Sequence, residues 1–155
     1  MRRDDEEALH GAWSHPTTLE FIEPEGEWTR AMTQERIAEK RAHQAFHGFS
    51  IWAVVERATG EVVGDTGLQM LEGGPDVEVG WRMAPDRRGR GYATEAARAA
   101  LAAGFGELGL DRIVAVTHPE NAASRRVMEK LGMTLIGPGR HDGGETVLYE
   151  TGGSG

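Results

Sequence analysis

The sequence predicts a single α+β domain, built as a mixed, mostly antiparallel sheet flanked by helices. Three observations support this fold class. Apolar residues recur with helical spacing over Asp4–Trp13 and again between Thr33 and Phe46, on either side of an irregular stretch. Three runs rich in β-branched and aromatic residues follow between residues 49 and 83, separated by short loops. Helical and strand patterns then alternate, as expected when helices pack on the faces of a sheet.

Two helices open the chain. The first, Asp4–Trp13, has acids in its first turn and apolar residues on one face, and it ends before Pro16. The second is expected to begin at Thr33 as its N-cap and to run to about Phe46, with Gly48 as its stop.

The three strands Phe49–Glu56, Glu61–Met70 and Asp76–Met83 are joined by short loops, which predicts an antiparallel meander. The third strand has two distinct faces because side chains alternate along a strand. One face is apolar and the other is mostly polar: Val77, Val79, Trp81 and Met83 on the first, and Glu78, Gly80 and Arg82 on the second.

The second half of the chain predicts five more elements. An alanine-rich helix over Ala93–Phe105 precedes an apolar strand over Arg112–Thr117, and Asn121 is placed to cap a helix that runs to Leu131. Two short strands separated by a glycine-rich turn complete the domain, at about 134–136 and 145–149. We expect one domain over residues 1–150 and a flexible Gly/Ser tail over 151–155.

Composition excludes several classes of function. The chain has no cysteine, so it contains neither a disulfide nor a thiolate metal site. Its formal net charge of −8 argues against general nucleic-acid binding, which needs a basic face. No apolar run approaches the roughly 20 residues of a membrane span, and no secretory signal opens the chain. These features are typical of a soluble cytoplasmic protein.

A loop with two glycines and three arginines joins the third strand to the alanine-rich helix. Glycine lets a backbone approach a ligand closely, and the start of a helix attracts anions, so this loop predicts a pyrophosphate site. A Walker loop is excluded because no Gly-Lys-Ser/Thr follows the glycines. Gly89, Gly91 and Thr94 match a dinucleotide fingerprint only partly, and Asp111 lies before the next strand rather than at its far end.

The segment Arg88-Gly89-Arg90-Gly91-Tyr92-Ala93 resembles the Arg/Gln-x-x-Gly-x-Gly/Ala acyl-CoA signature of the GNAT superfamily of N-acetyltransferases. Three further segments resemble the branch that includes the ribosomal-protein N-terminal acetyltransferases. These are the strand 77–81 before the loop and the segments 121–124 and 129–133 after it. The resemblance covers residues 4 to 150. Members of this family begin with a strand that is missing here, which leaves the strand Phe49–Glu56 near a sheet edge and suggests a homodimer.

The resemblance implies acetyl-CoA as co-substrate and no metal. It places the CoA pyrophosphate on the backbone N–H groups of one continuous segment, namely Arg88, Gly89, Arg90, Gly91, Tyr92, Ala93 and Thr94. It places the pantetheine arm along the end of the preceding strand, at Trp81, Arg82 and Met83, where the partner strand splays away. The side chain of Asn121 is expected near the pantetheine or the thioester.

An amine must be neutral to attack a thioester. Neutralising a lysine amine at pH 7 costs about 4–5 kcal/mol, whereas an α-amine costs only about 1 kcal/mol. Glu78, on the cofactor strand, is the candidate general base. Many family members carry a tyrosine acid in the helix after the asparagine, but this chain has Met128 there, so Ser124 is the candidate donor to the leaving thiolate, with Tyr149 and Tyr92 as outside candidates.

The function expected from this resemblance is N-acetylation of a primary amine, on a protein N-terminus or a small molecule, by direct attack in a ternary complex. The alternative is a non-catalytic acyl-CoA-binding module with the same fold. Two features carry less weight. His43 and His47 have a spacing that a metal site can use, but a surface or half-buried pair is favoured. His118 and the acids Glu20, Glu23, Glu25 and Glu27 are candidates to line or attract the acceptor.

Overall fold

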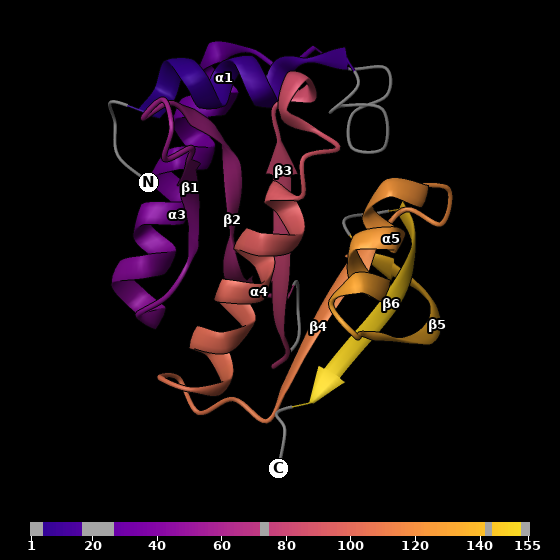
Figure 1. The fold of residues 1–155 in the computed structure, drawn as a ribbon. Coiled ribbons are helices and arrows are strands. Elements are labelled where there is room, and N and C mark those ends of the chain that lie inside the picture. The colour runs from indigo at the N-terminus through magenta and orange to yellow at the C-terminus, as the bar shows by residue number, and fades with distance from the viewer. Residues whose placement is uncertain (1–4, 17–26, 72–74, 142–143, 153–155) are drawn as a thin grey trace.

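The computed structural model describes residues 5–16, 27–71, 75–141 and 144–152 (Figure 1). The order of helices and strands predicted from the sequence is confirmed, with a short 3₁₀ turn, η2, added before the alanine-rich helix. The elements are α1 (Glu6–Ser14), α3 (Arg30–His47), β1 (Ile51–Val55), β2 (Val62–Met70), β3 (Val77–Met83), η2 (Pro85–Arg87), α4 (Tyr92–Phe105), β4 (Arg112–Thr117), α5 (Ala122–Lys130), β5 (Thr134–His141) and β6 (Gly144–Gly152).

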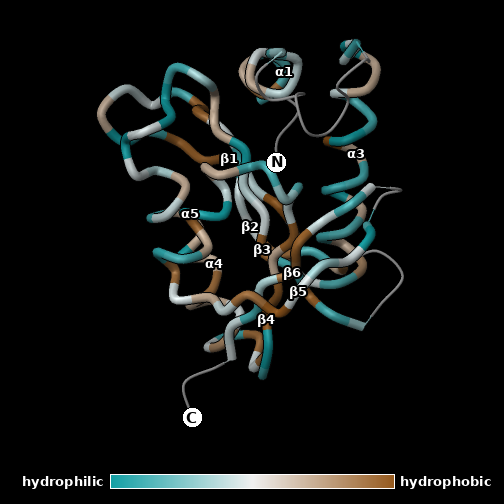
Figure 2. Tube along the Cα trace, turned by 90° about the vertical axis from the view of Figure 1, so that its right-hand side faces the viewer, coloured by the Kyte–Doolittle hydropathy of each residue, from teal (hydrophilic) through white to brown (hydrophobic). Residues whose placement is uncertain are grey.

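The sheet has six strands in the order β1-β2-β3-β4-β6-β5. The first three form the predicted antiparallel meander, and the pairs β4–β6 and β6–β5 are also antiparallel. The contact between β3 and β4 is parallel, which makes the sheet mixed as predicted. Figure 2 shows α4 and α5 on one side of the sheet and α3 on the other, and α1 crosses one end of the sheet (Figure 1).

Two apolar clusters hold these layers together. The larger lies under α4 and α5, where Val77 and Val79 of β3 meet Leu101 of α4 and Met128 of α5. The smaller joins the first two helices to the other face through buried residues of α1 and α3: Leu9, Ala12, Trp13 and Ile37. Because side chains alternate along β3, its apolar face packs in the larger cluster and its polar face is turned toward α3.

The start of α3 differs from the sequence expectation. The N-cap is Thr29 rather than Thr33: Thr29 has extended backbone angles, and its side chain accepts a hydrogen bond from the Met32 amide. Thr33 lies one turn inside the helix and is fully buried. Its hydroxyl contacts the Trp28 indole at 2.8 Å and the His10 ring at 2.7 Å. Thr33, the predicted cap, therefore packs against α1 instead of capping α3.

The last two strands are longer than predicted. β5 continues through the segment 137–139, which was expected to form a turn, and a bulge between Leu135 and Gly137 absorbs the irregularity. β6 extends to Gly152 and pairs there with Arg112. The first two residues of the expected tail, Thr151 and Gly152, therefore lie in a strand. Residues 153–155 lie outside the described residues.

The expected position of the first strand is confirmed, because β1 lies at one edge of the sheet and pairs with β2. Trp52 and Val55 are each 54% exposed on this strand. A homodimer at this edge stays a prediction. Within the part of the chain that the structure describes, no helix combines the length and apolarity needed to cross a membrane.

Candidate functional site

The loop between β3 and α4 has the backbone geometry of an anion site. Gly89 and Gly91 adopt left-handed conformations, with φ of 77° and 81°, and open space surrounds the position that a side chain would occupy at each. Gly91 is the N-cap of α4, and the first hydrogen bond of the helix runs from the Glu95 amide to the Gly91 carbonyl at 3.0 Å. The amides from Gly91 to Thr94 therefore precede the helical ladder and have no acceptor within the helix. Such N–H groups attract a negative charge.

Glu56, which follows β1, ties this loop to the sheet. The Tyr92 hydroxyl donates to one oxygen of Glu56 at 2.5 Å, and Thr59 donates to the other at 2.9 Å. Arg87 and Arg90 approach the same carboxylate at 3.6 and 4.0 Å. These donors hold the pKa of Glu56 below its usual range, with the Tyr92 hydrogen bond as the first cause and that of Thr59 as the second.

The arginines of the loop therefore divide into two groups. Arg87 is half-buried and forms ion pairs with Glu56, with Glu61 at 2.5 Å and with Asp86 at 3.5 Å. Its charge is neutralised by the protein itself. Arg88 and Arg90 are more exposed than Arg87 and lie just before the helix start, although Arg90 also approaches Glu56.

We expect Glu56→Gln to make the protein less stable at pH 7 by a few degrees in the unfolding midpoint. The pKa of Glu56 is lowered in the folded state, so its contribution is present above the unfolded pKa of about 4.3 and is lost as the pH falls through the folded value. Thermal unfolding of both proteins between pH 3 and 7 tests this. The difference should shrink toward pH 3, whereas Glu61→Gln, at an exposed residue, should change little. A difference that does not depend on pH would contradict the role of this carboxylate.

The strands β3 and β4 separate beside this loop. Their ladder consists of the pair Glu78–Val114, although β3 continues to Met83 and β4 to Thr117 (Figure 1). The sequence-predicted residues Trp81, Arg82 and Met83 lie on this diverging end. On the side that faces β4, the described β3–β4 ladder does not extend to these three residues. This is the arrangement expected for a strand whose backbone pairs with an extended ligand.

The start of α5 lies across the separation from α4. Asn121 caps α5 as predicted, because its side-chain oxygen accepts a hydrogen bond from the Ser124 amide at 3.1 Å. Ser124 is half-buried in the first turn of the helix. Met128, which replaces the expected tyrosine, is 1% exposed and belongs to the core.

The two outside candidates for the acid have charged partners. Tyr92 donates its hydroxyl to Glu56. The hydroxyl of Tyr149 accepts a hydrogen bond from the Arg125 guanidinium at 3.0 Å, and Arg125 also donates to the Pro119 carbonyl. Both hydroxyls therefore form hydrogen bonds within the protein, and Ser124 stays the candidate donor to the leaving thiolate.

Glu78 lies on the opposite side of the sheet from Ser124. It belongs to the polar face of β3, is half-buried and accepts a hydrogen bond from the Gln69 amide nitrogen at 2.7 Å. The structure does not place the two candidate catalytic residues on one surface. They approach the diverging strands β3 and β4 from opposite faces, so a ligand that passes between these strands would reach both sides.

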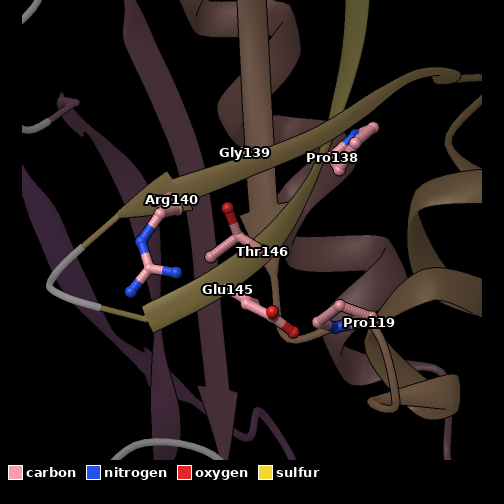
Figure 3. Close-up of a pocket in the computed structure, with 6 residues that line it drawn as sticks. All are labelled: Pro119, Pro138, Gly139, Arg140, Glu145 and Thr146. Carbon is pink, nitrogen blue, oxygen red and sulfur yellow. The ribbon is translucent and has the colours of Figure 1, made fainter.

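A pocket of about 440 Å³ lies between the β5–β6 hairpin and the turn before α5. Figure 3 shows the Glu145 carboxylate pointing toward Pro119, while Arg140 extends away from it along the hairpin. Pro138, Gly139 and Thr146 complete the lining. Glu78 is not among these lining residues, and His118 lies next to the pocket in sequence but is not part of its described wall.

Other sequence candidates have structural roles. Both ring nitrogens of His43 are used: Nδ1 contacts the Phe49 carbonyl at 2.8 Å, and Nε2 accepts a hydrogen bond from the Met70 amide at 3.0 Å. Burial is the largest cause of its lowered pKa. The neighbouring His47 stacks against it at 4.3 Å between ring centroids. The acids Glu20, Glu23 and Glu25 lie outside the described residues.

Sequence reasoning missed three residues that contact the candidate site: Glu56, Lys40 and Gln69. Each is an isolated polar residue: Glu56 follows β1, Lys40 lies on α3 and Gln69 lies within β2. Only the position of Gln69 directly opposite Glu78 in a hairpin offered a signal, since cross-strand neighbours share a face.

Comparison with known proteins supports one family. Residues 1–134 match the family model of the acetyltransferase (GNAT) domain. YkkB of Bacillus subtilis is 37% identical over 106 residues, covering 67% of this chain and 62% of its own length. The uncharacterized N-acetyltransferase YnaD, from the same organism, is 33% identical over 133 residues, covering 86% of this chain and 75% of its own length. The chain thus spans less than two thirds of YkkB.

Solved structures share the fold along nearly the whole chain. A GNAT-family acetyltransferase from Bacillus anthracis superposes with a TM-score of 0.83 at 30% identity, covering 98% of this chain and 91% of that chain. An acetyltransferase from Agrobacterium tumefaciens reaches 0.84 at 26% identity, covering 97% and 86%. The overall fold is therefore shared with known acetyltransferases, and the chain belongs to the GNAT family.

Proposed function

We propose that this protein is a cytoplasmic N-acetyltransferase that moves an acetyl group from acetyl-CoA to a primary amine by direct attack in a ternary complex. One observation carries the proposal. The diverging end of β3 runs directly into a loop whose left-handed glycines open the N-terminus of α4. An extended edge followed by an anion site suits a ligand with a long arm and a pyrophosphate.

The residues present fit CoA. The N-cap of α4 has no side chain to occupy the first amides, and open space surrounds both glycines. Arg88 to Thr94 would hold the pyrophosphate, Trp81 to Met83 would pair with the arm, and Asn121 would lie beside it. A related structure supports this assignment: Mycobacterium smegmatis RimJ, solved in complex with CoA-disulfide, has a TM-score of 0.77 at 25% identity and covers 98% of this chain and 79% of its own.

Acetyl-CoA, when bound, supplies the acetyl group as a thioester. Glu78 removes a proton from the acceptor amine, either directly or through water, because only a neutral amine is a nucleophile. The free energy needed to neutralise the amine at pH 7 is about 1 kcal/mol for an α-amine and larger for a lysine. The position of Glu78 on the α3 side of β3 keeps the base apart from the helix starts that bind negative charge.

Ser124 donates a hydrogen bond to the leaving sulfur. We expect Ser124→Ala to lower kcat about tenfold, because a hydrogen bond to a charged group is lost. The cap of α5 uses the backbone amide of Ser124 rather than its hydroxyl, so the substitution keeps the contact with Asn121. Thermal unfolding and CoA titration serve as controls and should match the parent protein. Unchanged turnover would remove Ser124 from the mechanism.

The acceptor amine is expected beside Glu78 on the α3 side of the diverging strands, because the base must lie within hydrogen-bond reach of the proton that it removes. Glu78 does not line the pocket beside the β5–β6 hairpin, and that lining carries both a carboxylate, Glu145, and a guanidinium, Arg140, so the pocket is not assigned to the acceptor.

A thiol-release assay with acetyl-CoA tests the proposal. The panel contains peptides with free N-termini, an N-terminally blocked lysine peptide and small polyamines. Release that depends on one amine class supports transfer and names the acceptor. The other candidate is a non-catalytic acyl-CoA-binding module, favoured by the buried Met128 in place of a tyrosine. Tight binding of CoA with no release on any amine would select that module.

A further inference from the structure

Three polar side chains form a continuous row on the α3 side of the sheet. Lys40 of α3 donates from its ammonium to the Oε1 atom of Gln69 on β2. The amide nitrogen of Gln69 in turn donates to Oε1 of Glu78 on β3, at 2.7 Å. Gln69 and Glu78 are direct partners in the antiparallel register, so the amide reaches the carboxylate without bending across the sheet.

The direction of this row follows from the chemistry of its ends. A lysine ammonium has only donors, and an ionised carboxylate has only acceptors. Gln69 satisfies both at once only when its oxygen faces Lys40 and its NH₂ group faces Glu78. The charge on Lys40 therefore selects one orientation of the amide. That orientation in turn fixes the position of one carboxylate oxygen.

We propose that Lys40 and Gln69 are positioning residues that orient Glu78 for proton removal, with the Gln69 amide as a neutral relay between the two charges. This inference rests on the proposed role of Glu78 as the base. It assigns a function to α3. Its residue Lys40 acts on the base through Gln69 and does not touch the reacting atoms.

A relay differs chemically from a direct ion pair. An ammonium in contact with a carboxylate favours the charged carboxylate and makes it a weaker base. An intervening amide keeps the hydrogen bond that orients the oxygen while it holds the cation one side chain away. A neutral amide stabilises the charged carboxylate less than an adjacent ammonium does, so it orients the oxygen with a smaller loss of basicity.

Lys40 itself titrates in the working range of an amine acetyltransferase. Burial lowers the pKa of Lys40 to about 8, and the like charges of Arg36 on α3 and Arg82 on β3 act in the same direction. Asp65 on β2 and Glu39 on α3 oppose this shift. Above the pKa, the neutral amine also accepts hydrogen bonds, so it no longer selects one orientation of the amide.

The first test uses the free protein and NMR. The chain has two lysines, and Lys130 is exposed on α5, so it is an internal reference for the Lys40 ammonium signal. We expect the carboxyl carbon signal of Glu78 to shift between pH 7 and 9 with the same midpoint as Lys40. Lys40→Met and Gln69→Leu should both abolish that coupled shift, and Gln69→Met replaces the leucine variant if it folds poorly. A Glu78 signal that does not follow Lys40, or that still follows it without Gln69, overturns the relay.

The second test uses turnover. Lys40→Met and Gln69→Leu should each lower kcat about tenfold with an unchanged KM for acetyl-CoA, as expected for the loss of a hydrogen bond to a charged group. Lys40→Arg should retain activity because it keeps the charged donor. Neither loss should appear in a Glu78→Gln background, since both act through that carboxylate. Additive losses in that background would overturn the inference and assign a merely structural role.

The two tests separate the failure of the relay from the failure of the proposed function. Absence of turnover on every amine would refute the proposed activity, and the NMR titration would still decide whether Lys40 is coupled to Glu78. Normal turnover in Glu78→Gln would overturn both the base and its positioning, even if the coupled shift were seen.

Discussion

Glu78→Gln is expected to lower kcat about 10²- to 10⁴-fold, the range that a general base contributes, and to leave the Kd for CoA unchanged. Glutamine keeps the shape and the acceptor for the Gln69 amide but cannot take a proton. The measurement is steady-state thiol release with a saturating amine, together with calorimetric titration of CoA. A fall in CoA affinity would place Glu78 in binding rather than in proton transfer.

The dependence on pH adds a signature that loss of folding would not show. An α-amine is mostly neutral above about pH 8, so it needs less help from a base there. The ratio of parent to variant kcat should therefore shrink as the pH rises from 6 to 9. Glu35→Gln is the matched control, because it removes an exposed carboxylate from α3 that is not among the charges acting on Lys40. It should behave like the parent protein, and a constant ratio for Glu78→Gln would contradict its role as base.

Gly91→Ala is expected to weaken the binding of CoA about ten- to a hundredfold, the cost of one or two charge-assisted hydrogen bonds. Gly91 is the N-cap of α4 with φ of 81°, and an alanine pays about 1–2 kcal/mol in this left-handed region. The backbone relieves that strain by shifting the first amides of the helix. Titration calorimetry with CoA measures the affinity, and thermal unfolding measures the strain.

Gly48→Ala is the matched control for this change. Gly48 has nearly the same φ, 83°, ends a helix rather than starting one, and likewise has open space around the missing side chain. Both variants should lose a similar amount of stability, and only Gly91→Ala should lose affinity for CoA. Equal affinities in the two variants would show that the amides of the α4 start do not hold the pyrophosphate.

Much of the frame of the site could be predicted from local sequence. The glycines of the loop, the alanine-rich helix and the Asn121 cap depend on backbone preferences within a few residues, and the structure confirms each of these elements. The prediction failed at Thr33, because two threonines four positions apart are both acceptable caps. The choice between them was made by burial against α1, which a local pattern does not contain.

The chemical surroundings of the site depend on contacts between distant segments. Glu56 meets Tyr92 across 36 positions of sequence, and Lys40 meets Gln69 across 29. Nothing in the residue types reveals such pairs in advance, because a glutamate or lysine alone is more often a solvated surface residue.

The sequence by itself determined the order of the elements, the polar and apolar faces of β3 and the glycine-bearing start of α4, because these follow from periodicity and local backbone conformation. Only the tertiary structure decided that Arg87 is neutralised by Glu56 and Glu61 and that α3 contacts Glu78 through Gln69. Strand pairing and the partners of buried charges are set by packing among segments far apart in the chain. The loop therefore pointed to the family, and the fold around it brings Lys40 and Gln69 into one row with Glu78, the proposed base.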